Sequence, residues 1–156
     1  MIELDSAADT ARAGDRLARH VAGGDAIALV GDLGAGKTTF VAGLVAALGG
    51  GAAASPTFSL VNEYPGGRLV VWHVDLYRLE RPAELPELGL DDMIGDPRGI
   101  VVIEWADRFD VMPPDHLRIE LAHTDAGRTR TLTATGTGPR GQALAGMLTA
   151  ELLGSS

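Results

Sequence analysis

Apolar and polar residues along the first fifty positions predict a helix, a buried strand and a second helix. Ser6, followed three residues later by Asp9, is typical of the start of a helix, and apolar residues at helical spacing continue to the glycines at 23–24. Residues 26–30 are an uninterrupted apolar run, which favours a strand covered on both faces. Residues 40–48 again carry one apolar stripe and are followed by three glycines. The pattern therefore predicts a strand, loop and helix unit.

The middle of the chain predicts a hairpin, a short helix and a further strand. Residues 59–64 and 68–75 are both strand-like, and only the Pro-Gly-Gly turn at 65–67 separates them, which favours an antiparallel hairpin. Pro82 is well placed in the first turn of a short helical region. The apolar residues 100–103 predict the next strand.

The last third of the chain predicts a second hairpin and a terminal helix. Residues 116–121 and 128–134 alternate in polarity and flank a turn at 125–127, which is typical of a hairpin with one solvated face. Residues 140–153 predict a helix packed on the sheet. No composition shift or repeat divides the chain, so we expect one domain covering residues 1–156.

Composition narrows the classes of function. The 156 residues contain no cysteine, which excludes a disulfide framework, a thiolate metal site and a thiol nucleophile. The net charge of -8 has the wrong sign for a protein that grips nucleic acid by neutralising phosphates. No leader pattern opens the chain, and no run approaches the ~20 apolar residues of a membrane span. We therefore expect a soluble, cytoplasmic protein with no membrane contact.

The segment GDLGAGKTT, residues 31–39, fits the phosphate-binding P-loop (Walker A) pattern, with a buried strand before it and an amphipathic helix after it. Glycines let the backbone curl around phosphate oxygens, so that N–H groups and the helix N-terminus point at them. Lys37, the single lysine among thirteen basic residues, supplies a charge for the β and γ phosphates, and the Thr38 hydroxyl can ligate Mg²⁺. The residues predicted to bind ATP in this segment are Gly31, Asp32, Leu33, Gly34, Ala35, Gly36, Lys37, Thr38 and Thr39.

The P-loop and the predicted elements together define a fold class. We expect an α/β protein with a three-layer fold like that of P-loop NTPases, in which helices flank a mixed, mainly parallel sheet that also carries antiparallel hairpins.

Two carboxylates follow predicted strands and are candidates to complete a nucleotide site. Glu104 comes after the apolar residues 101–103, a Walker-B-like pattern with Glu in the usual Asp position, and Asp75 follows residues 69–74. Nucleotide-bound Mg²⁺ normally takes a carboxylate from a neighbouring strand end. Each could instead be a solvated strand-end carboxylate, and the residues alone do not divide the two roles.

Four segments along the chain form a set: GDLGAGKTT at 31–39, SPTF at 55–58, HVDLYRL at 73–79 and IEWADR at 103–108. In their order and approximate spacing they resemble the TsaE family, the ATPase component of the bacterial machinery that makes threonylcarbamoyladenosine (t6A) in tRNA. The resemblance covers most of the predicted core. Its main departure is Val74, where an aromatic residue often precedes the aspartate, and this leaves Asp75 in place.

The resemblance implies particular roles for the candidate residues. Thr38 and Glu104 would hold Mg²⁺, and Asp75 would position or activate the attacking water. Thr57 would lie in a loop that senses the γ phosphate. Trp105 would be functionally sensitive beside the metal-site glutamate, although a core aromatic is an equal alternative.

Three further residues carry weaker expectations. Thr10 matches a family position near the adenine. Arg128 is a candidate to reach the nucleotide, with an exposed strand arginine as the favoured alternative. His73 shares a strand face with Asp75, and a structural histidine is favoured over a catalytic pair.

The resemblance implies that ATP hydrolysis resets a complex of TsaB and TsaD, in which TsaD modifies adenosine 37 of tRNA. tRNA would be met only indirectly, through that complex. No arginine is securely placed opposite the transferred phosphoryl group, although Arg78, Arg81 and Arg108 flank the motifs, so slow turnover alone and stimulation by a partner are predicted. The alternatives are a small-molecule or nucleotide kinase, and an assembly module that binds ATP without needing turnover.

Overall fold

The computed structural model describes the whole chain except residues 33, 51–60, 66, 78, 125–128 and 155–156, and of residue 87 it describes only the backbone. The strands are β1 (Ile2–Leu4), β2 (Ala26–Val30), β3 (Val61–Tyr64), β4 (Val70–Asp75), β5 (Gly99–Glu104), β6 (His116–His123) and β7 (Arg130–Thr137). The helices are α1 (Ala7–Ala18), α2 (Lys37–Ala47), α3 (Leu90–Met93) and α4 (Gly138–Gly154), with the 3₁₀ helices η1 (Pro82–Leu88) and η2 (Ala106–Arg108).

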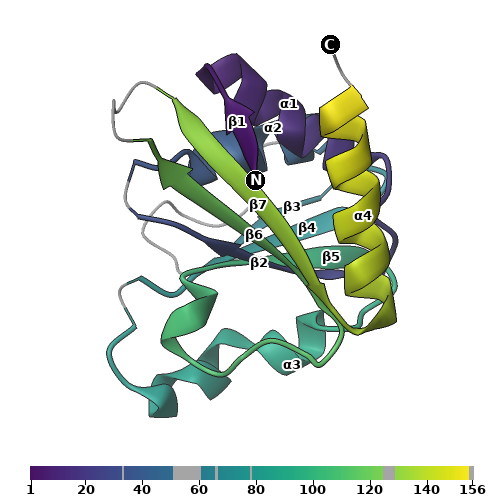
Figure 1. Ribbon diagram of the computed structural model, residues 1–156. Coiled ribbons are helices and arrows are strands. Elements are labelled where there is room, and N and C mark those ends of the chain that lie inside the picture. Colours follow the sequence, from purple (N-terminus) through teal and green to yellow (C-terminus); the bar gives the residue numbers. More distant parts are fainter. Residues whose placement is uncertain (33, 51–60, 66, 78, 125–128, 155–156) are drawn as a thin grey trace.

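The strands form one mixed sheet in the order β1-β7-β6-β2-β5-β4-β3 (Figure 1). Its centre is parallel, because β2 pairs in parallel with both β5 and β6, and β4 pairs in parallel with β5. The β3–β4 and β6–β7 pairs are antiparallel, as both predicted hairpins require. The expected α/β fold with a sheet that is parallel at its centre is therefore confirmed.

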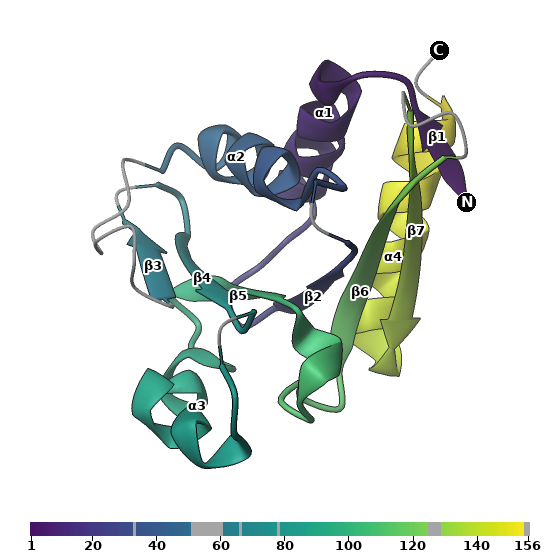
Figure 2. The ribbon, with the colours of Figure 1, turned by 90° about the vertical axis from the view of Figure 1, so that its left-hand side faces the viewer.

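The sheet is covered on both faces, which makes three layers. Figure 2 shows α2 and α3 on opposite sides of β2, β4 and β5. On the α2 side, one apolar cluster joins residues of α1, α2 and α4 to alternate residues of β2, β5 and β6. On the other side, residues of η1 and α3 pack with Trp72, Val74, Val101 and Ile103. Alternate side chains of β4 and β5 consequently belong to two different cores.

Helix α1 begins as predicted and ends earlier than predicted. The Ser6 hydroxyl accepts a hydrogen bond from the backbone N–H of Asp9 at 3.1 Å, as a helix cap does. The helix ends at Ala18 rather than at the glycines 23–24, and Arg68 donates to the carbonyl oxygens of Ala18, at 2.7 Å, and of Val21. Val21 is nevertheless buried. Its apolar character therefore extended the helical pattern beyond the helix itself.

Strand β1 was absent from the sequence prediction. It contains three residues and pairs with β7, with Ile2 opposite Leu132. Only Leu4 of this strand is buried. A segment this short, with one core residue, carries too little alternation to be recognised as a strand.

Helices α1 and α2 cross at very close range, and two glycines make this possible. A Cβ atom on Gly14 would lie 2.2 Å from the carbonyl oxygen of Phe40, and one on Gly43 would lie 2.1 Å from that of Ala11. Each glycine therefore receives the backbone of the other helix. This crossing fixes the start of α1 beside the start of α2.

The described part of the chain contains no helix that combines the length and the apolar character needed to span a bilayer.

Candidate functional site

The P-loop connects the buried strand β2 to the first turn of α2. Gly34 and Gly36 have left-handed backbones, with φ of 79° and 106°, and Gly36 is the residue that caps the helix. Gly31 has a different reason to be glycine, since a Cβ atom there would lie 2.3 Å from the carbonyl oxygen of Leu121 in β6. The loop thus curls tightly between the sheet and the helix, as backbone binding of phosphate requires.

The Lys37 side chain lies back against this loop. Its ammonium group donates to the carbonyl oxygens of Gly31 and of Asp32, the latter at 3.2 Å, and lies 4.0 Å from the centre of the Trp105 ring. Burial lowers the pKa of the Lys37 ammonium, while the carboxylates of Glu104 and Asp75 oppose this shift. Lys37 is therefore a buried cation close to the acidic residues of the site.

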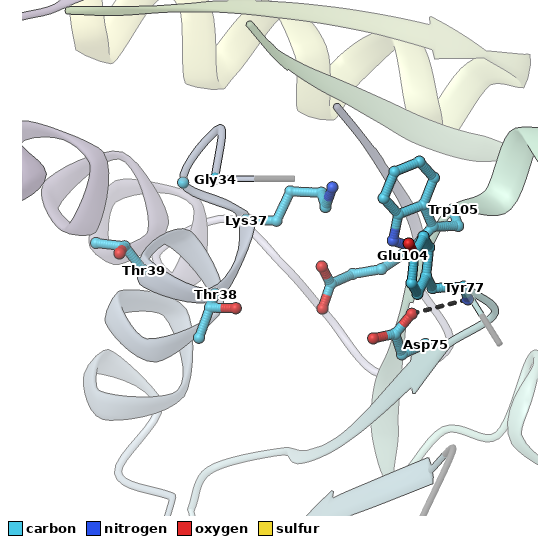
Figure 3. A pocket seen from close by; sticks show the side chains of 9 residues that line it. Gly34, Lys37, Thr38, Thr39, Asp75, Tyr77, Glu104 and Trp105 are labelled. Carbon is cyan, nitrogen blue, oxygen red and sulfur yellow. Dashed lines mark hydrogen bonds between the residues drawn. The ribbon is translucent and has the colours of Figure 1, made fainter. Parts of the chain in front are cut away.

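Asp75 and Glu104 end neighbouring parallel strands at the same level. They are direct partners in the β4–β5 register, so both carboxylates leave the sheet at one edge. Figure 3 shows the Glu104 carboxylate pointing from β5 towards the beginning of α2, where Lys37 and Thr38 lie. Oδ1 of Asp75 accepts a hydrogen bond from the backbone N–H of Tyr77 at 2.9 Å.

The cavity at this edge has a volume of about 290 Å³ and gathers residues from the P-loop, β4 and the end of β5. Its lining residues are Gly34, Gly36, Lys37, Thr38, Thr39, Asp75, Tyr77, Glu104 and Trp105. Of the other predicted P-loop residues, the Ala35 side chain is fully buried, which leaves its backbone for a ligand. Leu33, Thr57 and Arg128 lie outside the described residues, so their expected roles stay predictions.

His73 contacts Glu104 rather than Asp75. Its Nε2 is in hydrogen-bond contact with Oε2 of Glu104, and the two side chains are only 11% and 7% exposed. The His73 ring also stacks on Tyr64, with the ring centres 6.5 Å apart. The favoured structural interpretation of His73 is supported by these contacts, and its partner is the candidate metal ligand.

Trp105 belongs both to the cavity and to the apolar core beneath it. Its backbone is left-handed, with φ of 61°, which turns the chain sharply after β5. The ring packs partly against the second apolar cluster and partly beside Tyr77, with the ring centres 5.0 Å apart. A role for Trp105 in the site and a role as a core aromatic residue are therefore compatible.

Two residues of the site were missed from the sequence. Tyr77, two positions after Asp75, is 45% exposed and lines the cavity, and its exposure could not be read from an apolar pattern. Arg130 donates to the carbonyl oxygen of Gly34 at 3.2 Å. The prediction chose Arg128 on the same segment, where strand periodicity alone does not distinguish the two arginines.

A smaller cavity of about 150 Å³ opens on the other side of the P-loop. It is lined by residues of β1, of α1 and of the turn between them, among them Ser6 and Thr10, together with Gly36, Thr39 and Arg130. Thr10 is 2% exposed, and its hydroxyl donates to the carbonyl oxygen of Ser6 at 3.3 Å. Thr10 thus lies next to the P-loop, and its expected place near the adenine stays a prediction.

The donor atoms at the main cavity fit Mg²⁺ in one particular way. Among the described residues, no group of three or more His, Cys, Asp and Glu side chains is arranged to hold a metal ion. The Thr38 hydroxyl and the Glu104 carboxylate are oxygen donors that line the same cavity. Mg²⁺ commonly takes one or two protein ligands and completes its shell with phosphate and water. This donor set fits that pattern.

Comparisons with known proteins identify relatives of this chain. The family model described as "Threonylcarbamoyl adenosine biosynthesis protein TsaE" matches residues 4–132. A protein of Nostoc sp. named tRNA threonylcarbamoyladenosine biosynthesis protein TsaE is 43% identical over 122 residues, which are 76% of this chain and 75% of that protein. A protein of the same name from Streptomyces coelicolor is 38% identical over 81% of this chain and 90% of its own length.

A solved structure extends the likeness to three dimensions. The crystal structure of YdiB from Bacillus subtilis superposes with a TM-score of 0.79 at 29% identity, covering 96% of this chain and 93% of YdiB. The fold and the P-loop at its strand, loop and helix unit place the chain in the class of P-loop α/β proteins. Within that class, the chain belongs to the TsaE family.

Proposed function

We propose that this protein is a Mg²⁺-dependent ATPase of the cytoplasm that is required for t6A modification of tRNA at adenosine 37. In this role it cycles a complex of TsaB and TsaD by binding and hydrolysing ATP. The observation that carries the proposal is that Lys37, Thr38, Asp75 and Glu104 line one cavity, in a chain of the TsaE family.

The P-loop residues would bind the triphosphate. Backbone N–H groups at the start of α2 would face the phosphate oxygens, helped by the positive end of the helix. The Lys37 ammonium would exchange the carbonyl oxygens of Gly31 and Asp32 for the β and γ phosphates. This exchange moves a buried cation from weak neutral acceptors to strong anionic ones, which favours binding.

Thr38 and Glu104 would hold Mg²⁺, which supplies neutralisation of the phosphate charge when it is bound. Asp75 would orient or deprotonate the attacking water, because it is the second carboxylate of the cavity and lies level with Glu104. Thr57 is proposed as the γ-phosphate sensor. Thr10 would lie near the adenine, and Arg128 would reach the nucleotide.

Slow hydrolysis by the chain alone is supported by the positions of the described arginines. None of them lines the main cavity. Arg108 donates to the carbonyl oxygens of Leu76 and Tyr77, and Arg130 to that of Gly34, so these guanidinium groups are engaged with backbone. An arginine finger raises phosphoryl-transfer rates by about 10³ to 10⁵ where it has been measured. We infer that a protein partner stimulates turnover, and the net charge of -8 suits a protein better than bare tRNA.

The proposal is tested by steady-state ATP hydrolysis with Mg²⁺, using the chain alone and with purified TsaB and TsaD. Lys37→Ala and Glu104→Ala are expected to abolish the stimulated rate, and Asp75→Ala to abolish hydrolysis while ATP still binds. If the chain binds nucleotide but TsaB and TsaD do not change its rate, the P-loop assignment would stand and the proposed role in tRNA modification would be wrong. Persistent function of Asp75→Ala in cells would instead favour the assembly module.

A further inference from the structure

The contact between His73 and Glu104 joins two strands diagonally. His73 on β4 is level with Val102, and Glu104 lies two residues further along β5. Because alternate residues of a strand point to the same side, His73, Asp75 and Glu104 all face the α2 side of the sheet. The imidazole therefore lies immediately behind the two carboxylates of the cavity.

Apart from the electrostatic attraction of the Lys37 ammonium, the Glu104 carboxylate has no side-chain partner but His73 among the described residues. The one hydrogen-bond contact of its carboxylate in that part of the chain joins Oε2 to Nε2 of His73. A glutamate side chain has several rotatable bonds, and the torsion of its carboxylate is broad. Without this contact, a side chain that is only 7% exposed would keep neither a donor nor a fixed orientation.

His73 is itself held in place. Tyr64 of β3 stacks on its ring at an interplanar angle of 27°, and the side chain is 11% exposed. Nδ1 of His73 is buried and has no hydrogen-bond partner among the described residues. A ring that carries its hydrogen on Nε2 satisfies the Glu104 contact and leaves Nδ1 as the bare acceptor. Thr38 lines a cavity together with Tyr64 and His73, so this ring stands close to the other candidate metal ligand as well.

We propose that His73 is the positioning residue for the metal-binding carboxylate. Its Nε2–H group holds Oε2 of Glu104, and a carboxylate oriented in this way would hold Mg²⁺ together with the Thr38 hydroxyl. The inference rests on the proposed function and deepens it. Groups that orient metal ligands from behind typically change metal affinity by about 10- to 100-fold when they are removed. His73 should accordingly affect Mg²⁺-dependent binding more than nucleotide binding as such.

The test compares His73→Leu with His73→Gln. Glutamine carries a donor nitrogen the same number of bonds from Cβ as Nε2 of histidine, whereas leucine has no donor. Affinity for a non-hydrolysable ATP analogue is measured by calorimetry with excess Mg²⁺ and again with a chelator. The affinity with Mg²⁺ divided by the affinity with the chelator is expected to be about tenfold or more lower in His73→Leu than in the wild-type protein. In His73→Gln this ratio should stay close to the wild-type value.

A second comparison isolates the route through Glu104. In a Glu104→Gln background, adding His73→Leu should change the ratio little further, because the two residues act on one ligand. His73→Asn, whose amide is one bond too short to reach Glu104, should behave like His73→Leu and serves if the leucine variant does not fold. Thermal unfolding without ligand establishes that each variant is folded.

Two results would overturn the inference. One is an unchanged Mg²⁺ ratio in both His73→Leu and His73→Asn. The other is an equal loss of affinity with Mg²⁺ and with the chelator, which would mean that His73 only supports the shape of the pocket. The wild-type protein is measured first. If its nucleotide affinity does not depend on Mg²⁺, the metal site of the proposed function is refuted, whatever the His73 variants show.

Discussion

Trp105 adopts a backbone conformation that side chains other than glycine rarely occupy. It is the one non-glycine residue with a positive φ in the described part of the chain. The left-handed region costs an ordinary residue about 1–2 kcal/mol. In return, the turn brings the indole ring beside the Lys37 ammonium and the Tyr77 ring. Local backbone strain of this kind is concentrated at functional sites, and this instance borders the main cavity.

Substitution at Trp105 separates the backbone strain from the lost ring contacts. Trp105→Gly and Trp105→Ala both remove the ring, but only glycine relieves the left-handed strain. Trp105→Ala is therefore expected to be less stable than Trp105→Gly by about 1 kcal/mol, measured by urea unfolding. Equal stability of the two variants would show that the left-handed turn is not retained in the absence of the ring.

At the scale of single elements, the crossing of α1 and α2 depends on glycines that have no room for a methyl group. Gly43→Ala would place Cβ against the backbone of Ala11 and is expected to destabilise the protein by about 1–3 kcal/mol. Gly146→Ala is the matched control, since it is also helical and no atom lies within 4 Å of the position that its methyl group would take. The control should raise stability by about 0.5–1 kcal/mol. The free energies of unfolding of both variants are measured by chemical denaturation. An unchanged stability of Gly43→Ala would contradict the close crossing of the two helices.

Helix α4 is joined to the start of β2 by a partly buried ion pair. Nε and Nη2 of Arg140 donate to the Asp25 carboxylate, at 3.0 and 2.9 Å, and the Asp25 side chain is only 6% exposed. The pairing with Asp25 raises the pKa of Arg140. Arg140→Ala leaves the Asp25 charge buried with fewer hydrogen-bond donors. The free energy of unfolding should fall by about 2 kcal/mol, which is less than for a fully buried pair because Arg140 itself is 38% exposed.

The control for Arg140 is Arg98→Ala, which removes an ion pair whose arginine is 76% exposed. Its effect on the urea midpoint should be clearly smaller. If both variants lose the same stability, the Arg140–Asp25 pair contributes no more than a surface contact.

The sequence predicted the central elements because each left a strong local signal. Strands β2 and β5 are uninterrupted apolar runs, and the P-loop has a fixed spacing of glycines with Lys37. Strand β1 and the end of α1 depend on partners far along the chain, β7 and Arg68, which local patterns do not contain. The contact between His73 and Glu104 likewise depends on the register of β4 and β5. The sequence therefore identified both residues as candidates but did not predict that they touch.

For the molecule as a whole, a bound nucleotide should appear as increased thermal stability. A ligand present at 100 times its dissociation constant stabilises the folded state by about 2.7 kcal/mol, or roughly 5–10 °C for a chain of this length. ADP with Mg²⁺ is therefore expected to raise the midpoint of thermal unfolding by that amount. Lys37→Ala should abolish the shift. A shift that persists in Lys37→Ala would indicate binding away from the P-loop.

The pairing of β1 with β7 has a consequence for the order in which the protein is made. Synthesis delivers the N-terminus first, at about 5–20 residues per second, so Ile2 waits on the order of ten seconds for its partner Leu132. Gly31 packs against Leu121, and β2 lies between β5 and β6, which also emerge later. The phosphate loop is therefore translated early and acquires its final support late. A nascent chain that stops before β6 should not yet bind nucleotide.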